Sequence, residues 1–211
     1  MKKEYVFGIL FFSGLWGISE AVLGGVLYRA NAAYASVPLS VIGFVVLTFA
    51  WVYFPRAGAA TLIAACAMLY KFFNAPFFAC HLLGILLMGA CYDLFFGVFK
   101  IKSRSLSALA ATYLSYGLFA LMITYVFRYE HWVQGGFGGV LGHIGIAGSI
   151  AALACAVLVP LSFRFAQRLK AGFAMPFGFS QQWAAGSISV ITIALWGFGI
   201  AAYLLNYLPV R

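Results

Sequence analysis

The chain has 211 residues, of which 65% are hydrophobic and 8% are charged, and its mean hydropathy is +1.02. A soluble domain does not need this much apolar surface to fill its core, so the composition excludes an ordinary soluble protein and indicates an integral membrane protein. The formal net charge of +9 does not indicate nucleic-acid binding, because the basic residues are spread through short segments and do not gather on one polar face.

Seven apolar runs are each about long enough, as helices, to cross a hydrocarbon layer of roughly 30 Å. In chain order they are Tyr5 to Tyr28, Val37 to Phe54, Ala57 to Phe73, Pro76 to Phe99, Leu106 to Phe127, Gly139 to Phe163 and Ala184 to Leu208. The longer polar or glycine-rich segments between them are an outer loop, Arg128 to Gly138, and an inner segment, Arg164 to Trp183. Neither is long enough to separate domains. We therefore expect residues 1–211 to form a single all-α transmembrane domain, a polytopic helix bundle.

The distribution of lysine and arginine predicts the orientation of this bundle. If the N-terminus is cytoplasmic, nine basic residues lie on the inner side and four on the outer side, in agreement with the positive-inside rule. The inner group is Lys2, Lys3, Arg56, Lys100, Lys102, Arg104, Arg164, Arg168 and Lys170, and the outer group is Arg29, Lys71, Arg128 and Arg211. We therefore expect a multi-pass protein with its N-terminus in the cytoplasm.

Two acidic residues lie inside the runs, and burying a charge in a membrane is costly enough to invite a functional explanation. Glu20 shares a helix face with small residues of the first run, so we expect it to face another helix. Asp93 lies nearer the cytoplasmic half. Either acid could relay protons in a coupled carrier, or could hydrogen-bond to a neighbouring helix. In the first run Gly17, Ala21 and Gly25 also form a small-residue stripe that permits close packing, within the chain or with a partner subunit.

Cys80 is the residue with the most distinctive chemistry. Pro76 is expected to open the fourth helix, which puts the thiol about 6 Å further along, near the unpaired N–H groups and the positive end of the helix dipole. This position favours the thiolate, a soft metal ligand and a nucleophile. The alternative is that Cys80 packs as a small apolar residue, as we expect for Cys66, Cys91 and Cys155. His81 points about 100° away around the helix, so it cannot share one small ion with Cys80.

All three histidines and several aromatic and polar residues fall on the predicted outer side, together with Cys80. This composition is typical of a large amphipathic pocket, although a membrane protein also carries aromatic residues at its headgroup level. The predicted pocket residues are Tyr28, Arg29, Tyr34, Lys71, Phe72, Phe73, Asn74, Phe77, Cys80, His81, Arg128, Tyr129, Trp132 and His143.

The chain resembles the substrate-binding S-components of energy-coupling-factor transporters, and more closely the BtuM group of solitary S-components. The resemblance covers the layout of most of the chain, including Gly14 to Ala21 in the first helix, and its specific part is the segment Pro76 to His81. It implies uptake of cobalamin across the bacterial inner membrane, with the ligand site facing the periplasm and Cys80 matching the cysteine that binds cobalt from below. It also implies displacement of the dimethylbenzimidazole tail and removal of cyanide from cyanocobalamin, so Cys80 would be the catalytic residue.

S-components usually have six helices, so the resemblance implies that Ala184 to Leu208 is an additional helix or that one shorter run does not cross. The sequence has no GxxxxGK[ST] loop, so we expect no ATP hydrolysis by that route and no dedicated ATPase module, although a borrowed motor is possible. The expected partners are cobalamin and the lipid bilayer, with no nucleic acid and no free metal ion. Two other functions stay open: a proton-coupled carrier of another small metabolite that uses Glu20 or Asp93, and a b-type haem protein that uses His81 and His143.

Overall fold

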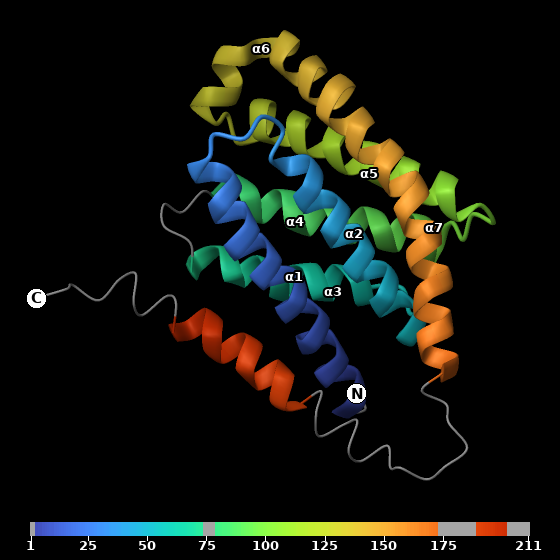
Figure 1. Ribbon diagram of the computed structural model, residues 1–211. Helices are drawn as coiled ribbons and strands as arrows, with labels where there is room; N and C mark the ends of the chain where they lie inside the picture. Colours follow the sequence, from blue (N-terminus) through green and yellow to red (C-terminus); the bar gives the residue numbers. More distant parts are fainter. Residues whose placement is uncertain (1–2, 74–78, 173–188, 202–211) are drawn as a thin grey trace, which may run out of the picture.

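The computed structural model describes residues 3–73, 79–172 and 189–201, and the whole of the regular structure in these ranges is helical (Figure 1). The chain begins with α1 (Lys3–Arg29), α2 (Ser36–Tyr53), α3 (Ala59–Ala67) and a 3₁₀ segment, η1 (Met68–Phe73). It continues with α4 (Ala79–Tyr92), η2 (Asp93–Val98), α5 (Arg104–Leu121), η3 (Met122–Val126), α6 (Glu130–Gly142), η4 (His143–Gly148) and α7 (Ser149–Gly172). The segments η2, η3 and η4 are π-helical, and a last helix covers Ser189–Ala201.

These helices confirm the predicted all-α membrane bundle. Five helical stretches are long and apolar enough to cross a membrane: Tyr5–Leu27, Ser36–Tyr53, Cys80–Val98, Arg104–Val126 and Glu130–Ala171. Two more apolar helices are shorter, Ala59–Phe72 and Ser189–Ala201. Each of the seven predicted runs therefore contains a helix, and the flanking parts of the last run, 184–188 and 202–208, lie outside the described residues.

The boundaries of the sixth predicted run are wrong, because α6, η4 and α7 form one helical stretch from Glu130 to Gly172. Gly136 has a φ of +54°, which suits glycine and lets the chain kink without leaving the helix on either side. The predicted outer loop is consequently mostly helical. At the other end, the Lys170 ammonium donates a hydrogen bond to the Val52 carbonyl at 2.7 Å and lies over the Tyr53 ring. This contact ties the basic end of α7 to α2.

From α1 to α5 consecutive helices run in opposite directions, so their ends gather at two ends of the bundle (Figure 1). We call one the site end; it is formed by the C-terminal ends of α1 and α5 and the N-terminal ends of α2 and α4. The described members of the two basic groups predicted from the sequence therefore lie at opposite ends, with Arg29 and Lys71 at the site end and Arg56 and Lys102 at the other. The assignment of the two ends to cytoplasm and periplasm stays a prediction.

The small-residue stripe of α1 contacts other helices of the same chain at Gly17. A Cβ atom at Gly17 would lie 2.2 Å from the ring of Tyr70, which is completely buried. Tyr70 in turn lies 4.8 Å from the ring of Trp196 in the last helix, and the indole of Trp196 donates a hydrogen bond to the Leu10 carbonyl at 3.1 Å. Gly17 thus allows η1 and the last helix to pack closely on α1. At Gly25 a Cβ would meet nothing within 4 Å.

Asp93 holds the start of α3 against α4 and has a structural role. Its carboxylate is 6% exposed and accepts hydrogen bonds from the backbone N–H of Ala60 at 3.3 Å, and from the N–H and hydroxyl of Thr61 at 2.7 and 2.6 Å. The residue before α3 is Gly58, which has no side chain to cap the helix. Asp93 therefore supplies from a neighbouring helix the acceptor and the negative charge that a helix N-terminus favours.

We expect Gly17→Ala to lower the free energy of unfolding by about 1–3 kcal/mol, because the new methyl group overlaps the Tyr70 ring. Gly117→Ala in α5 is the matched control, since a Cβ there meets nothing within 4 Å. Thermal unfolding in detergent measures both variants. Equal melting temperatures for the two would show that Gly17 is not needed for packing.

We expect Asp93→Ala to lower the free energy of unfolding by about 1–3 kcal/mol, because it removes the acceptor of two buried N–H groups. Glu130→Ala, which removes an exposed acid, is the control and should change stability little. If Asp93→Ala unfolds like the wild type but abolishes function, Asp93 is a relay and its structural role is wrong.

Candidate functional site

A cavity of about 810 Å³ opens at the site end of the bundle. Its wall comes from the second half of α1, the start of α2, η1, the first turns of α4, the last turns of α5, the first residue of η4 and the last helix. The residues with polar or charged side chains in this wall are Glu20, Arg29, Asn31, Ser36, Ser40, Tyr70, Lys71, His81, Ser115, Tyr116 and His143. Apolar residues such as Leu39, Ile85, Met88 and Phe119 fill the spaces between them. An apolar cavity with a few convergent polar groups is typical of a ligand-binding site.

Four of the predicted pocket residues line this cavity together: Arg29, Lys71, His81 and His143. They come from α1, η1, α4 and η4, so the fold brings into one wall residues that are far apart in the sequence. Ala21 and Gly25 of the small-residue stripe also line the cavity. The small side chains of α1 therefore serve two purposes, since Gly17 admits Tyr70 and the residues beyond it leave space for a ligand.

Other predicted residues do not line the cavity. Tyr34, Phe72, Arg128 and Tyr129 are exposed, and Tyr129 borders a separate shallow depression of about 400 Å³ with Glu130, His131 and Gln134. Trp132 lies behind the wall, where it contacts the ring of His143. Asn74 and Phe77, and the side chains of Tyr28 and Phe73, lie outside the described residues.

Cys80 is the second residue of α4 and is half-buried. It is not among the described residues that line the cavity, but its sequence neighbour His81 is, and so is Gly84 one helical turn further along. Residues four apart lie on the same helix face, so Cys80 stands at the edge of the lining face of α4, above Gly84. Pro76, which we expect to open this helix, lies outside the described residues.

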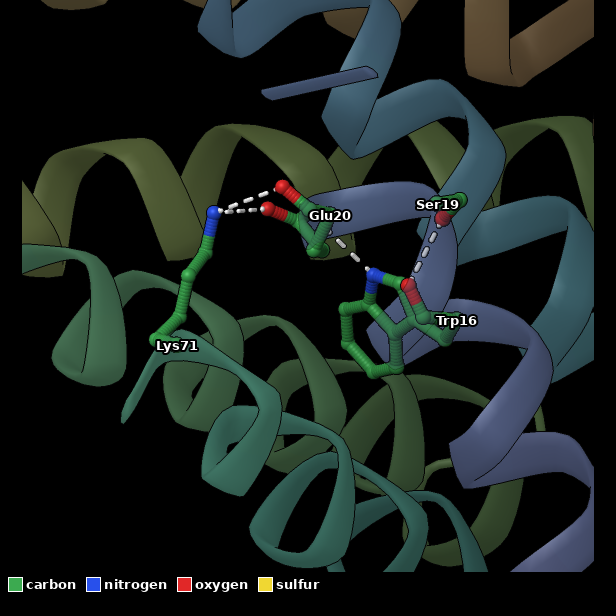
Figure 2. Close-up of polar contacts among 4 residues, drawn as sticks. All are labelled: Trp16, Ser19, Glu20 and Lys71. Carbon is green, nitrogen blue, oxygen red and sulfur yellow. Dashed lines mark hydrogen bonds and ion pairs between the residues drawn. The ribbon is translucent and has the colours of Figure 1, made fainter. Parts of the chain in front are cut away.

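A buried ion pair joins η1 to α1 at the cavity wall (Figure 2). The Lys71 ammonium lies 2.8 Å from Glu20 Oε2 and donates a second hydrogen bond, at 3.1 Å, to the Glu20 carbonyl oxygen. The other carboxylate oxygen of Glu20 accepts a hydrogen bond from the Trp16 indole at 3.3 Å. Both residues are only 4% exposed. The prediction that Glu20 faces another helix is thus confirmed, and its partner is a cation.

His143 belongs to an aromatic cluster that restricts what its imidazole can do. Its ring stacks on Tyr116 at 5.1 Å and meets the edge of Trp132 at 4.9 Å. Phe119 lies at 5.7 Å. A haem iron ligand must direct a ring nitrogen at the metal along an open path, and an imidazole packed against three rings is poorly placed to do this. In the described residues no three His, Cys, Asp or Glu side chains converge in a way that could hold a metal ion.

Several wall residues could not be found from the sequence. Tyr116 and Ser40 meet across α5 and α2 with 3.0 Å between their hydroxyl oxygens, and they are 76 positions apart in the chain. Such a contact depends on how two helices pack, and a single sequence carries no signal for it. Ile85 and Met88 could have been found, because they follow His81 at the spacing of one helix face.

We expect Lys71→Met to destabilise the protein by about 3–5 kcal/mol, because it leaves the Glu20 carboxylate buried without its cation. The double variant Glu20→Leu/Lys71→Met should recover most of this loss, since an apolar pair of similar volume needs no ionic partner. Thermal unfolding of the two variants tests the pair. If the double variant is as unstable as Lys71→Met, the loss comes from packing of the lysine stem and not from the uncompensated charge.

Comparison with protein-family models, with curated proteins and with solved structures gave no match to this chain. The membership of the BtuM group implied by the resemblance therefore stays a prediction.

Proposed function

We propose that the protein binds a corrinoid in the cavity at the site end and carries it across the bacterial inner membrane, with Cys80 as the lower axial ligand of cobalt. The observation that carries this proposal is the position of the half-buried Cys80 thiol, one helical turn above Gly84 at the edge of an amphipathic cavity of about 810 Å³. A thiol at the edge of a ligand cavity, near the start of a helix, can reach a metal that the ligand itself carries.

The composition of the cavity fits a large amphipathic ligand. A corrin ring has an apolar core and a rim of amide groups, and the wall combines Met88, Ile85 and Phe119 with hydroxyl, imidazole and charged side chains. Pockets for drug-sized ligands have volumes of about 300–1,000 Å³, and a corrinoid is larger than such ligands. In the proposed pose the ring therefore lies at the mouth over the N-terminal end of α4, and its side groups enter the cavity.

Cobalt ligation gives Cys80 its proposed role in decyanation. A thiolate is a soft and strongly donating ligand, and cobalt bound from below by sulfur holds an upper cyanide less firmly when the metal is reduced. One electron from an added thiol would convert cobalt(III) to cobalt(II), and the cyanide would leave as an anion. Two thiols that have each reduced one cobalt centre lose their protons and join as a disulfide. Cys80 itself keeps the metal in place during this step.

A proton-coupled carrier is the second candidate, because Glu20 lines the cavity in a buried ion pair. Buried acids that face a ligand cavity are typical of carriers that exchange protons with their substrate. Asp93 is not part of this candidate, since its carboxylate is used to cap α3. The two candidates differ in the residue on which they depend: the corrinoid function depends on Cys80, and a carrier of another metabolite should tolerate its removal.

We expect the purified protein to shift the absorption spectrum of cyanocobalamin, and we expect Cys80→Ala to abolish this shift and to weaken binding at least about tenfold, or 1.4 kcal/mol. Cys66→Ala is the matched control, because Cys66 is also half-buried but lies on α3, outside the cavity wall. Spectrophotometric titration of the three proteins gives both quantities.

The proposal is wrong if Cys80→Ala changes the spectrum of cyanocobalamin as the wild type does, or if the wild type binds no corrinoid. If the Cys80→Ala variant takes up another metabolite with full activity and the Glu20→Gln variant takes up none, the protein is the proton-coupled carrier.

A further inference from the structure

The Lys71–Glu20 ion pair occupies a place where an apolar pair would serve stability better. Removing two charges from water costs several kcal/mol per ion, and well-packed apolar residues often replace such a pair without loss. Both side chains are 4% exposed and both belong to the cavity wall. A buried ionic pair beside a ligand cavity of a membrane protein therefore points to a role in binding.

The ammonium of Lys71 is placed so that it could bind an anionic group of a ligand. It makes two hydrogen bonds, both to Glu20, and an ammonium has three N–H donors. It lies against α1 beside Gly24, where a Cβ atom would come within 3.3 Å of the Lys71 nitrogen. Gly24 also lines the cavity. The absence of a side chain at this position thus leaves room for the nitrogen at the wall.

The charges of the wall favour an acidic group in the ligand. Among the described residues of the wall, Arg29 and Lys71 are cationic and Glu20 is the one acid. An anionic group that enters the cavity meets two cations, one of which is already neutralised by Glu20. Such a ligand has to compete with Glu20 for the ammonium.

We propose that an acidic group of the ligand, a phosphate or a carboxylate, replaces the Glu20 carboxylate at Lys71, and that Glu20 then takes up one proton, so that binding is coupled to protonation. The balance is simple: the Lys71–Glu20 contact breaks, a Lys71–ligand contact forms, and one proton passes from solvent to the Glu20 carboxylate. A carboxylate that has lost its cation in a buried site is costly as an ion, and the neutral acid is not.

Other titratable and charged groups face the same space, and the test must separate them from Glu20. They are Arg29 on α1, Tyr70 on η1, His81 on α4, Tyr116 on α5 and His143 on η4. The inference rests on the proposed function, because cobalamin carries the phosphodiester that would be the acidic group. Cobinamide, a corrinoid without this phosphate, is therefore the matched probe.

The experiment measures binding by calorimetry in buffers with different ionisation enthalpies, which gives the number of protons taken up. Cobalt ligation by Cys80 releases the thiol proton with either corrinoid, so the difference between the two ligands reports on Glu20: near neutral pH we expect cyanocobalamin binding to take up about one proton more than cobinamide binding. The ratio of the affinities for cyanocobalamin and cobinamide should rise about tenfold for each unit by which the pH falls, since one additional proton is bound with cyanocobalamin. The phosphodiester keeps its charge over this range, so the ligand adds no proton of its own.

Variants assign the proton to Glu20. We expect Glu20→Gln to bind cyanocobalamin at least as tightly as the wild type, without the difference in proton uptake between the two corrinoids and without the pH dependence of their affinity ratio, because no carboxylate competes for Lys71. Lys71→Gln should lose at least tenfold in affinity. Glu130→Gln, an exposed acid on α6, should behave as the wild type. If Glu20→Gln keeps the difference in proton uptake between the two corrinoids, or if the wild type shows no such difference, the inference is overturned.

The inference can fail separately from the corrinoid function. Corrinoid binding with equal proton exchange for cyanocobalamin and cobinamide would overturn the inference alone. If no corrinoid binds, the proposed function fails, and sulfate, whose charge does not change with pH, becomes the probe. Sulfate should then raise the melting temperature of the wild type, and the rise should be larger at low pH. In Lys71→Gln and in Glu20→Leu/Lys71→Met, sulfate should raise the melting temperature only by a general salt effect. An equal rise in all three proteins overturns the inference.

Lipid headgroups offer the same phosphate chemistry, so the titrations are repeated with added phosphatidylglycerol. We expect the lipid to leave cyanocobalamin affinity and proton uptake unchanged. If phosphatidylglycerol competes with cyanocobalamin and itself causes the proton uptake, the acidic group belongs to a lipid, and the assignment of the site to a transported ligand is overturned.

Discussion

The ion pair between Lys71 and Glu20 is the interaction on which the arrangement of the site end depends. It joins the 3₁₀ segment η1 to the middle of α1, and the same contact area includes the fully buried rings of Tyr70 and Trp16. Asp93 binds the first residues of α3, and Glu20 binds Lys71 in the last turn of η1. The two buried acids therefore hold both ends of the α3–η1 stretch. One acid holds the stretch to α4 and the other holds it to α1.

The sequence predicts the fold class well because that information is local. The length and hydrophobicity of each run determine whether a helix can cross a membrane, and each of the seven runs contains a helix. The ends of the sixth run depend on longer-range effects. The helix continues beyond Phe163 to Lys170, whose ammonium donates a hydrogen bond to α2, and it begins before Gly139 through a kink at Gly136, where φ is positive. Neither is visible in a hydropathy pattern.

The candidate site was predictable only in part, for a similar reason. Topology alone places Arg29, Lys71, His81 and His143 at one end of the bundle, and these four do share a wall. It does not say which way each side chain turns. Trp132 lies at the same end but packs behind His143, and Cys80 stands at the edge of the wall instead of in its centre. The pairing of Glu20 with Lys71 needs the packing of two segments 51 positions apart, so the two charges look unrelated in the sequence although the fold joins them in one ion pair.

The two chemical groups of the site are complementary in what they can recognise. Cys80 is a soft donor at the mouth, suited to a metal, whereas Lys71 and Arg29 are cations suited to a hard oxygen anion. A ligand that carries both a metal and an acidic group could engage both ends of the cavity at once, and the second contact would then be intramolecular and cost little further entropy. A ligand with only one of these groups would use half of the site. Selectivity for a corrinoid with its phosphate would thus come from the distance between the thiol and the ammonium, which the packing of η1 on α1 and of α4 on α3 sets.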